Sequence, residues 1–450
     1  MSAPSAVTMP TKASKALKVL HTSDWHLGRR LYGRPRYDEF AAFLNWLQET
    51  ISAQHVDVLI VAGDIFDTMT PSNKAQALYY EFLGRVAKSC CQHVIIVAGN
   101  HDSPSFLDAP SHVLKFLNVH VIGTACEDLH DEVLVLDDIN GTAHCIIAAV
   151  PYLRDRDVRS SQAGESAQTK DANVIAGIRG HYDKVADIAK TKQAELIKTQ
   201  QRHIPIIATG HLFAAGGQTT EDDGVRELYV GSLGKVSADM FDAGFDYVAL
   251  GHLHVPQRVG GREHIRYSGS PIAMGFGEAR QQKQVLLVQF AAADAPINDM
   301  PHQDNLGHNL NHNLSQMRII PLPIPTFQPL AQISGDLTTI AQTIDALSQH
   351  EAVWLEIVYT GDEIVSGLKE KVHEMVKDSV FEVLITKAAN SYNKVLNQQQ
   401  ASETLEDLNE MDVFERCLTA HNVAAAQKQA LRDAYEQIVY DLHHQDTQAE

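Results

Sequence analysis

The chain has 450 residues, 44% hydrophobic residues and a formal net charge of −19. With roughly 150 residues per domain, this length predicts about two or three domains. The ordinary shares of hydrophobic and charged residues exclude a largely disordered protein, and no apolar stretch approaches the roughly 18 residues of a membrane span. The acidic charge argues against nucleic-acid binding, because DNA affinity comes largely from Lys and Arg.

The N-terminal residues and the cysteines indicate a cytoplasmic protein. The N-terminal segment lacks the continuous apolar region of a secretory signal, and residues 1–16 are interpreted as a flexible tail. The five cysteines form no C-x-x-C pair, and Cys90 and Cys91 are adjacent. This pattern predicts neither a disulfide framework nor a zinc ribbon.

From residue 17 to about 280, apolar runs of strand length alternate with segments of helical period, as in a layered α/β domain. The first run, LKVL, leads into HTSDWHLGRR, where Asp24 and His26 stand two residues apart. Side chains at i and i+2 of an extended segment point to the same side, so both would face a metal ion just past the strand. The alternative is that Asp24 caps the next helix and His26 is a surface histidine.

Four later runs end in glycine followed by a polar side chain. They are VDVLIVAGD, which ends at Asp64, HVIIVAGNHD, which reaches Asn100 and His101, IPIIATGH, which ends at His211, and FDYVALGHLH, which ends in His252 and His254. Glycine allows unusual backbone angles and a close approach of the chain to an ion. In open α/β sheets the site lies beyond the carboxyl ends of the strands, so these side chains are predicted to converge.

The segments that follow carry no readable chemistry. The polar stretch Asp155–Asn173 lacks periodicity and is predicted to be a surface loop. Residues 281–325 are predicted to be a strand, QVLLVQF, and a linker, in which the Asn- and His-rich part 301–314 is solvated and PLPIPTFQPL is a proline-rich connector.

Two further regions complete the predicted organisation. Within residues 326–396, the segments VWLEIVYT, GLKEKVHEMVKDS and FEVLITK predict a strand, a helix and a strand, and so a small second domain. Residues 397–450 carry two apolar stripes of helical period: Leu405, Leu408, Met411, Phe414 and Leu418, then Leu431, Ala434, Ile438 and Leu442. These stripes either pack on the second domain or present an apolar face to a partner.

The polar side chains at the ends of the apolar runs form a set typical of a two-metal site. They are Asp24, His26, Asp64, Asn100, His211, His252 and His254. Oxygen and imidazole ligands together suit Mn²⁺, Fe²⁺ or Zn²⁺ better than Mg²⁺ or Ca²⁺, and the lack of thiolates argues against a structural zinc. Two such metals, about 3.5–4 Å apart, can activate water and clamp a phosphate ester. The predicted chemistry is therefore hydrolysis of a phosphate ester.

The motifs resemble a known family. SDWHLG, GDIFD, GNHD, the GH at Gly210 and the GHLH at Gly251 resemble, in this order, the five motifs of the calcineurin-like metallophosphoesterases. Longer segments, among them HTSDWHLGRRLYGRPRYDEF and RYSGSPIAMGFGE, resemble more narrowly the nuclease subunits of bacterial SbcCD complexes. The resemblance covers almost the whole chain except the tail and residues 301–314. It implies an α/β fold: a two-layered β-sandwich flanked by helices, with a small α/β capping domain and C-terminal helices.

The resemblance also implies roles for the site residues. One Mn²⁺ would be held by Asp24, His26 and His254, the other by Asn100, His211 and His252, with Asp64 bridging them; Mg²⁺ or another divalent metal is the alternative. His101 would protonate the leaving 3′ oxygen as general acid, unless it is a histidine merely satisfied by Asp102. Asp67 and Asp102 would orient metal-bound histidines.

The segment GRRLYGRPRY could bind DNA although the net charge of the chain is negative. It gathers four arginines beside the first motif: Arg29, Arg30, Arg34 and Arg36. Such a rim would give an acidic protein a local cationic surface for DNA phosphates. The alternative is that these arginines pair with surface acids such as Asp38 and Glu39.

The resemblance implies a Mn²⁺-dependent nuclease subunit that works with an SbcC-type coiled-coil ATPase, as a homodimer within a heterotetramer, in the cytoplasm and at the nucleoid. It would cut double-stranded DNA ends and hairpins as an ATP-dependent exonuclease and endonuclease in DNA repair, recombination and replication. One rival is a phosphatase or phosphodiesterase for small substrates, which would not need the chain beyond residue 280. The other is a non-catalytic scaffold of the ATPase, which would not need the ligand set and His101.

Overall fold

A computed structural model describes residues 16–159, 167–214, 237–291, 317–347, 351–361, 363 and 365–389, and Phe414, Leu418, Gln429, Leu431, Arg432 and Tyr435 beyond them. The chain divides into two compact units, Met1–Leu330 and Ala331–Glu450. Among the described helices, none combines the length and the apolar character that crossing a bilayer requires.

The first unit contains two six-stranded sheets. The first sheet holds, in spatial order, β14 (Met317–Pro323), β13 (Gln284–Phe290), β1 (Leu17–Thr22), β4 (Val58–Ala62), β5 (His93–Val97) and β6 (Val119–Ile122). The second holds β11 (Gln257–Val259), β12 (Arg262–Tyr267), β10 (Tyr247–Gly251), β9 (Ile206–His211), β8 (Ala143–Ala148) and β7 (Val133–Asp137). Strands β1, β4, β5 and β6 are mutually parallel, and so are β8, β9, β10 and β12. The carboxyl ends of these strands therefore gather at one edge of each sheet.

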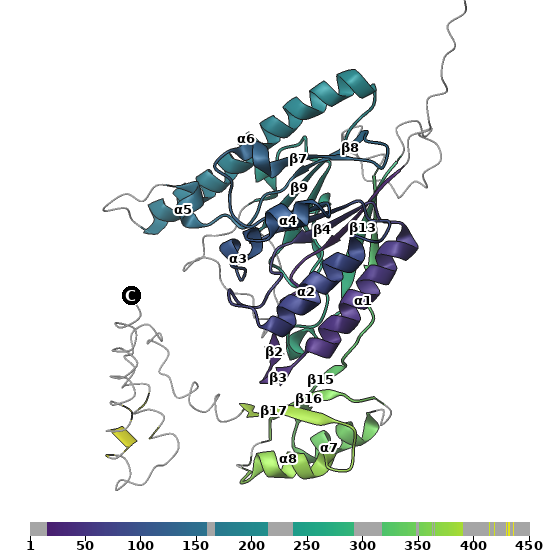
Figure 1. Ribbon diagram of the computed structural model, residues 1–450. Helices are drawn as coiled ribbons and strands as arrows, with labels where there is room; N and C mark the ends of the chain where they lie inside the picture. The colour runs from purple at the N-terminus through teal and green to yellow at the C-terminus, as the bar shows by residue number, and fades with distance from the viewer. Residues whose placement is uncertain are drawn as a thin grey trace, which may run out of the picture. The chain divides into compact units, whose positions relative to one another are not determined.

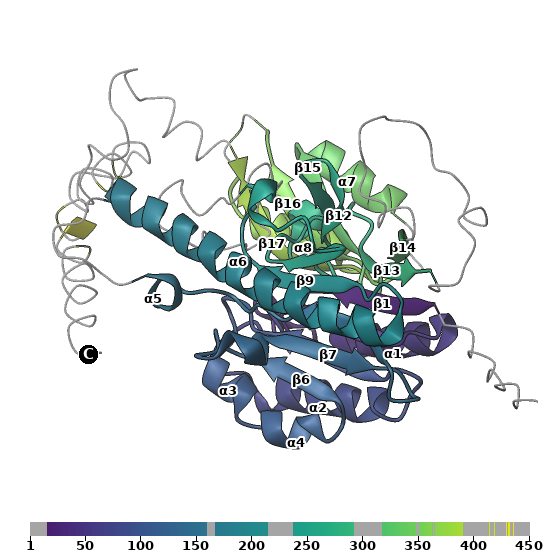
Figure 2. The ribbon, with the colours of Figure 1, turned by 90° about the horizontal axis from the view of Figure 1, so that it is seen from above.

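The two sheets pack face to face, and helices cover their outer faces. A layer of apolar side chains lies between the sheets, with Ile60 and Ile95 on one side and Ile147 and Ile207 on the other. Helices α1 (Tyr37–Gln54) and α2 (Asn73–Val86) pack on the first sheet. Helix α6 (Ala167–Gln200) packs along the second sheet, on the opposite side of the unit (Figures 1 and 2). This arrangement confirms the predicted β-sandwich flanked by helices.

Short elements complete the first unit. They are the hairpin β2 (Arg30–Leu31) and β3 (Arg34–Pro35), the helices α3 (Pro104–Asp108), α4 (Ser111–Lys115) and α5 (Asp155–Val158), and the 3₁₀ turns η1 (Leu129–Glu132), η2 (Ala238–Met240) and η3 (Phe276–Glu278). The central strands are apolar on both faces because both faces are covered: every residue of β4, VLIVA, is buried.

Two predictions about this unit are wrong. The stretch Asp155–Asn173 is not a continuous loop, because α5 occupies its start and α6 begins at Ala167. The proline-rich connector is in part a strand, since β14 extends to Pro323 and pairs with β13 along its whole length. Proline is tolerated there because β14 lies at the edge of the sheet.

The second unit has a three-stranded sheet, β15 (Leu330–Gly335), β16 (Trp354–Tyr359) and β17 (Glu382–Ala388), in that spatial order. Helices α7 (Leu337–Ala346) and α8 (Leu368–Val376) cover one face of the sheet (Figure 1) and share an apolar core with it. The predicted strand, helix and strand are present, and β15 and α7 add to them. Most of residues 397–450, including the greater part of both predicted stripes, lies outside the described residues.

Candidate metal centre

Each predicted metal ligand stands at the carboxyl end of a parallel strand. In the first sheet, β1 leads to Asp24 and His26, β4 to Asp64, and β5 to Asn100. In the second sheet, β9 ends at His211, and β10 leads to His252 and His254. The facing sheets therefore bring ligands from distant parts of the chain to one place, as the strand-end pattern predicts.

The backbone that carries these ligands is left-handed at several positions. Asp24, His26 and Asp64 have φ angles of 53°, 47° and 51°, a region that residues other than glycine rarely adopt. Hydrogen bonds hold this conformation: the Asp24 N–H donates to Gly63 O and the His26 N–H to Asp64 O, each over 3.0 Å. The prediction that Asp24 and His26 converge because they lie on an extended segment is therefore wrong. Tight backbone turns aim them instead.

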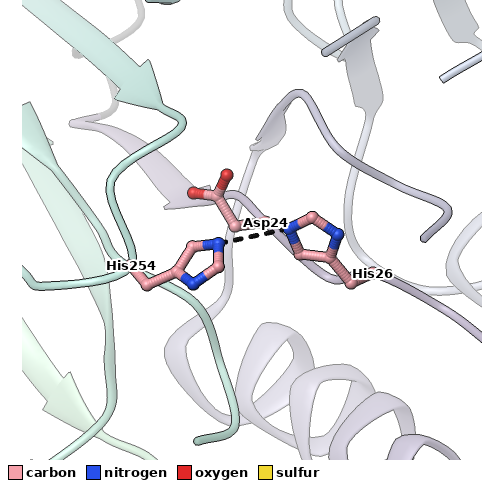
Figure 3. Close-up of side chains that lie close together, drawn as sticks. All are labelled: Asp24, His26 and His254. Atoms are coloured by element: carbon pink, nitrogen blue, oxygen red, sulfur yellow. Dashed lines mark hydrogen bonds between the residues drawn. The ribbon is translucent and has the colours of Figure 1, made fainter. Parts of the chain in front are cut away.

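Three overlapping groups of side chains could each hold a cation. Their ligand atoms lie within 4.8 Å of one another, and the groups are Asp24, His26 and His254; His26, Asp64 and His101; and Asp64, His211 and His252. Figure 3 shows the first group, with the imidazoles of His26 and His254 turned toward each other and Asp24 beside them. The two Nε2 atoms are 3.2 Å apart. A cation between two such lone pairs would account for this approach.

Asp64 connects the first and third groups. Its Oδ2 lies 3.5 Å from His26 Nε2 and 3.3 Å from His211 Nε2. Its Oδ1 accepts a hydrogen bond from the backbone N–H of His101 over 2.9 Å. Asn100 completes this side, with its Oδ1 2.9 Å from His211 Nε2. One carboxylate oxygen thus stands between two sets of imidazole nitrogens.

The hydrogen bonds of the histidines fit metal ligation. His211 directs Nδ1 to the carbonyl oxygen of Ala62 at 3.0 Å, which leaves Nε2 for the site. His254 likewise directs Nδ1 away, to Glu278 at 3.3 Å. The buried Nε2 of His252 has no hydrogen-bond partner among the described residues. Buried polar atoms are rarely left unpaired, so an ion at this position would supply the missing partner.

The electrostatics of the site also favour a cation. Burial disfavours a charged imidazole at His211, but the Asp64 carboxylate outweighs burial and raises the pKa of His211 to about 9. Burial alone would raise the pKa of Asp64, yet His211 and His26 hold that pKa well below its usual range. Burial, helped by the charge of His211, lowers the pKa of His252 well below its usual range. The imidazole of His252 is therefore neutral, the form that binds a metal.

His101 lies against the first group. Its ring meets the ring of His26 edge to face, with centroids 4.8 Å apart. Its Nδ1 is 2.9 Å from the backbone oxygen of Asp67, so Nδ1 donates to that carbonyl and Nε2 stays available. The alternative that Asp102 satisfies this histidine does not match these contacts. His101 also forms one of the three candidate groups with His26 and Asp64. Its position is therefore compatible with two roles, that of a general acid and that of a metal ligand.

The two outer carboxylates behave differently from each other. Asp67 Oδ1 lies 3.5 Å from His26 Nδ1, and that Asp67 orients this imidazole stays a prediction. Asp102 instead accepts hydrogen bonds from backbone N–H groups of Ile65, Phe66 and Gly99, at 3.1, 2.9 and 2.9 Å. The prediction that Asp102 orients a histidine is therefore wrong. It holds together the loops that follow β4 and β5.

The four arginines predicted to contact DNA differ in burial and in their partners. Arg36 is only 2% exposed, and its guanidinium binds both oxygens of Glu39, at 2.7 and 2.8 Å, and the carbonyl oxygen of Ala273. Its predicted contact with DNA is therefore wrong, because a buried and fully paired guanidinium is not available to phosphates. Arg29 is half-buried, with Nη1 3.4 Å from Asp67 Oδ1. Arg30 and Arg34 are exposed on the β2–β3 hairpin.

The sequence reasoning missed Glu278 and Lys283. Both are buried and form an ion pair directly behind His254. Burial opposes ionisation of Glu278, but His254 and Lys283 outweigh burial and lower the pKa of Glu278 to about 2. Glu278 is the last residue of the segment RYSGSPIAMGFGE, which carries part of the family resemblance. Nothing in the sequence shows that this glutamate is buried.

Comparison with known proteins identifies the family of this chain. A family model described as calcineurin-like phosphoesterase matches residues 17–256, and one described as type 5 capsule protein repressor C-terminal domain matches residues 326–422. The SbcD subunit of the SbcCD nuclease of Escherichia coli K12 is 34% identical over 430 residues, which span 95% of this chain and 98% of that protein. The proteins of the same name from Rhodobacter capsulatus and Bacillus subtilis are each 35% identical, over 74% and 60% of this chain and 76% and 66% of their own lengths. The chain therefore belongs to the calcineurin-like phosphoesterases and, among them, to the SbcD family of SbcCD nucleases.

Proposed function

We propose that this chain is the Mn²⁺-dependent DNA nuclease subunit of an SbcCD-type complex. The observation that carries the proposal is the position of Asp64, whose Oδ2 lies within 3.5 Å of imidazole nitrogens on both sides. A carboxylate shared between two imidazole sets suits a pair of metal ions close enough together to act on one phosphodiester. The names of the relatives supply the reaction class, that of a nuclease.

The proposed metals are two Mn²⁺ ions, with Mg²⁺ or another divalent ion as the alternative. Asp24, His26 and His254 would hold one, and Asn100, His211 and His252 the other, with Asp64 between them. Imidazole together with carboxylate and amide oxygen suits Mn²⁺ well. When bound, two such ions would draw charge from the phosphodiester and lower the pKa of a nearby water.

His101 is proposed as the general acid. With Nδ1 donating to Asp67 O, a second proton on this ring resides on Nε2. From there it would pass to the leaving 3′ oxygen as the P–O bond breaks. Asp67 would act on two neighbours at once, because its backbone oxygen orients His101 and its carboxylate lies 3.5 Å from His26 Nδ1.

The proposed substrates are double-stranded DNA ends and hairpins, cut by ATP-dependent exonuclease and endonuclease action. Arg30 and Arg34, exposed on the short hairpin that follows the first ligands, support phosphate binding near the site. The net charge of the chain is −19, so these two arginines alone would bind DNA weakly. The rest of the DNA affinity would come from a partner protein.

The proposed partners are an SbcC-type coiled-coil ATPase and a second copy of the chain, in a heterotetramer found in the cytoplasm and at the nucleoid. The relatives' name, which describes one subunit of the SbcCD nuclease, supports the first partner. Exposed apolar side chains around α4 support a protein contact on the first unit: Val113, Phe116 and Leu117 are 69%, 91% and 45% exposed.

A cleavage assay tests the proposal. Linear duplex and hairpin DNA are incubated with the full chain and Mn²⁺, with and without the coiled-coil ATPase and ATP, and Asp64→Ala serves as the inactive control. We expect cleavage of both substrates that needs Mn²⁺ and increases with the ATPase and ATP. Hydrolysis of a small chromogenic ester without cleavage of either DNA under any of these conditions would refute the nuclease function.

A further inference from the structure

A buried ion pair lies directly behind one of the candidate metal ligands. Glu278 is fully buried and Lys283 is 5% exposed, and both belong to the chain segment between β12 and the start of β13. Glu278 Oε1 is 3.3 Å from His254 Nδ1. Glu278 belongs to none of the three candidate ligand groups, so the pair acts on the site through His254.

The contacts of Glu278 assign a separate function to each of its oxygens. Oε1 faces His254 Nδ1. Oε2 accepts from two groups that can only donate, the backbone N–H of Met274 at 2.9 Å and the Lys283 ammonium, and it lies 3.4 Å from the hydroxyl of Ser270. The carboxylate is therefore fixed in one orientation, with Oε1 as the acceptor for the imidazole.

Lys283 holds the other side of the same histidine. Its Nζ donates to the backbone oxygen of His254 at 3.3 Å and to Ser270 Oγ at 3.0 Å, besides binding Glu278. A buried carboxylate needs such a counter-charge to remain ionised. Backbone and imidazole of His254 are thus held by one ion pair.

We propose that Glu278, fixed by Lys283, is a positioning residue that keeps the proton of His254 on Nδ1 and leaves Nε2 as the metal-binding atom. The proposal rests on the assignment of His254 as a ligand. A carboxylate that accepts from the outer nitrogen of a histidine fixes its tautomer and makes the inner nitrogen a better ligand. The 3.2 Å approach of His254 Nε2 to His26 Nε2 shows that Nε2 of His254 points into the candidate metal group.

The isosteric variant Glu278→Gln gives a sharp test. Because Met274 N–H and Lys283 can only donate to the Oε2 position, glutamine must place its oxygen there. Its NH₂ group then faces His254 Nδ1, which has to accept, and the proton moves to Nε2. The variant would keep the shape of the side chain while removing the lone pair that binds the metal.

The alternative is that Glu278 only closes the segment between β12 and β13. In that case Glu278→Gln, which keeps most of the hydrogen bonds, would reduce Mn²⁺ affinity and thermal stability less than Glu278→Ala. A second buried pair in the same unit provides the matched control: Glu132 Oε2 is 2.7 Å from His181 Nε2, with both residues buried, and neither belongs to a candidate metal group.

The experiment titrates Mn²⁺ into the full chain by calorimetry for the parent, Glu278→Gln, Glu278→Ala and Glu132→Gln, and records thermal unfolding of each in EDTA. We expect the parent to bind two ions. Both Glu278 variants should bind one ion about tenfold to a hundredfold more weakly, with glutamine affected at least as much as alanine, and Glu132→Gln should bind as the parent does. In NMR spectra of the metal-free chain labelled with ¹⁵N-histidine, His254 should be protonated on Nδ1 in the parent and on Nε2 in Glu278→Gln.

The outcomes separate this inference from the proposed function. A parent chain that binds no Mn²⁺ would overturn the metal centre itself. A parent that binds two ions, together with a Glu278→Gln variant that binds both equally well or keeps the proton on Nδ1, would overturn only the role of Glu278. Should alanine prevent folding, the isosteric glutamine variant still decides between these results.

Discussion

Asp64 differs from the other ligands because a single oxygen atom serves two groups. Its Oδ2 lies 3.5 Å from His26 Nε2 and 3.3 Å from His211 Nε2. Asp64→Ala should therefore weaken both metal sites, whereas His26→Ala should weaken mainly one. Calorimetric titration with Mn²⁺ measures the number of ions bound by each variant. If both variants still bind two ions as tightly as the parent, the shared-carboxylate assignment is wrong.

His101 should contribute to chemistry more than to metal binding. General-acid catalysis contributes about a hundredfold to ten-thousandfold in rate, so His101→Gln is expected to lose about this factor while still binding DNA and two Mn²⁺ ions. Single-turnover cleavage and metal stoichiometry, measured on the same preparation, check the prediction. His211→Ala is the comparison and should lose metal as well as activity.

Two results would change the assignment of His101. Cleavage close to the parental rate would remove its catalytic role. Loss of one ion would make it a ligand, which its place in the group with His26 and Asp64 permits.

At the residue scale, the sequence predicts residue types but not burial. Polar residues after apolar runs predict the candidate metal ligands, because the carboxyl ends of parallel strands meet at one edge of a sheet. Arg36 pairs with Glu39 three residues along the chain, as the alternative in the sequence allowed, but nothing in the sequence shows that this pair is buried. The partners of Asp102, the amides of Ile65, Phe66 and Gly99, depend on how the loops after β4 and β5 fold over one another. No local pattern of residues predicts the contacts of Asp102 with Ile65 and Phe66.

At the scale of elements, substitutions on and next to the β2–β3 hairpin can distinguish an effect on DNA binding from an effect on stability. The double variant Arg30→Ala and Arg34→Ala should weaken DNA binding and lower the slope of log K against log salt concentration by about one to two, because up to two phosphate contacts are lost. Thermal unfolding should change far less than in Arg36→Ala, because both side chains are exposed. DNA affinity at several salt concentrations, measured with the metal ions present, tests this.

Arg36→Ala on the same segment should have the opposite effect. It leaves the buried carboxylate of Glu39 without its partner, which typically costs about 3–5 kcal/mol of stability. The salt dependence of DNA binding by the folded protein should not change. An altered salt slope in this variant, or an unaltered one in the double variant, would contradict the assignment of these arginines.

The errors at the element scale have a common cause. The first turns of α6, AQTKDAN, carry no apolar stripe, and Val174 is the first buried residue of α6 among the side chains that the structure describes. A pattern based on apolar periodicity therefore cannot detect the start of this helix. Strand β14 was missed because its prolines are atypical of strands in general, although an edge strand accepts them. Periodicity detects an element where the element is buried, and both segments lie partly outside the core.

For the whole molecule, the division of ligands between two sheets ties metal binding to stability. Asp24, His26, Asp64 and Asn100 come from one sheet, and the three remaining histidines from the other. Ions bound only by the folded chain should stabilise it by about 2.7 kcal/mol for each site at a free concentration of one hundred times Kd. We expect the midpoint of thermal unfolding to rise with Mn²⁺ and to fall on adding EDTA. Asp64→Ala should respond much less, and an equal response would argue against ligation by both sheets.

The predicted C-terminal stripes concern assembly. Removal of residues 401–450 should leave activity on a small chromogenic ester intact, because the candidate metal ligands all lie before residue 255. It should abolish copurification with the coiled-coil ATPase. Copurification that remains unchanged would mean that the stripes pack only within their own chain.

Strand β14 has a further consequence for how the molecule behaves in a crowded cell. Its Ile324 neighbour donates its N–H to Lys283 O over 2.8 Å, so the alternating nitrogens of Pro321 and Pro323 face away from β13. Proline has no N–H, and an extended segment from another protein that approaches this edge would therefore find no donor at either position. The outermost described strand of the first sheet thus resists aggregation by strand addition, which would otherwise threaten a sheet with so many apolar residues.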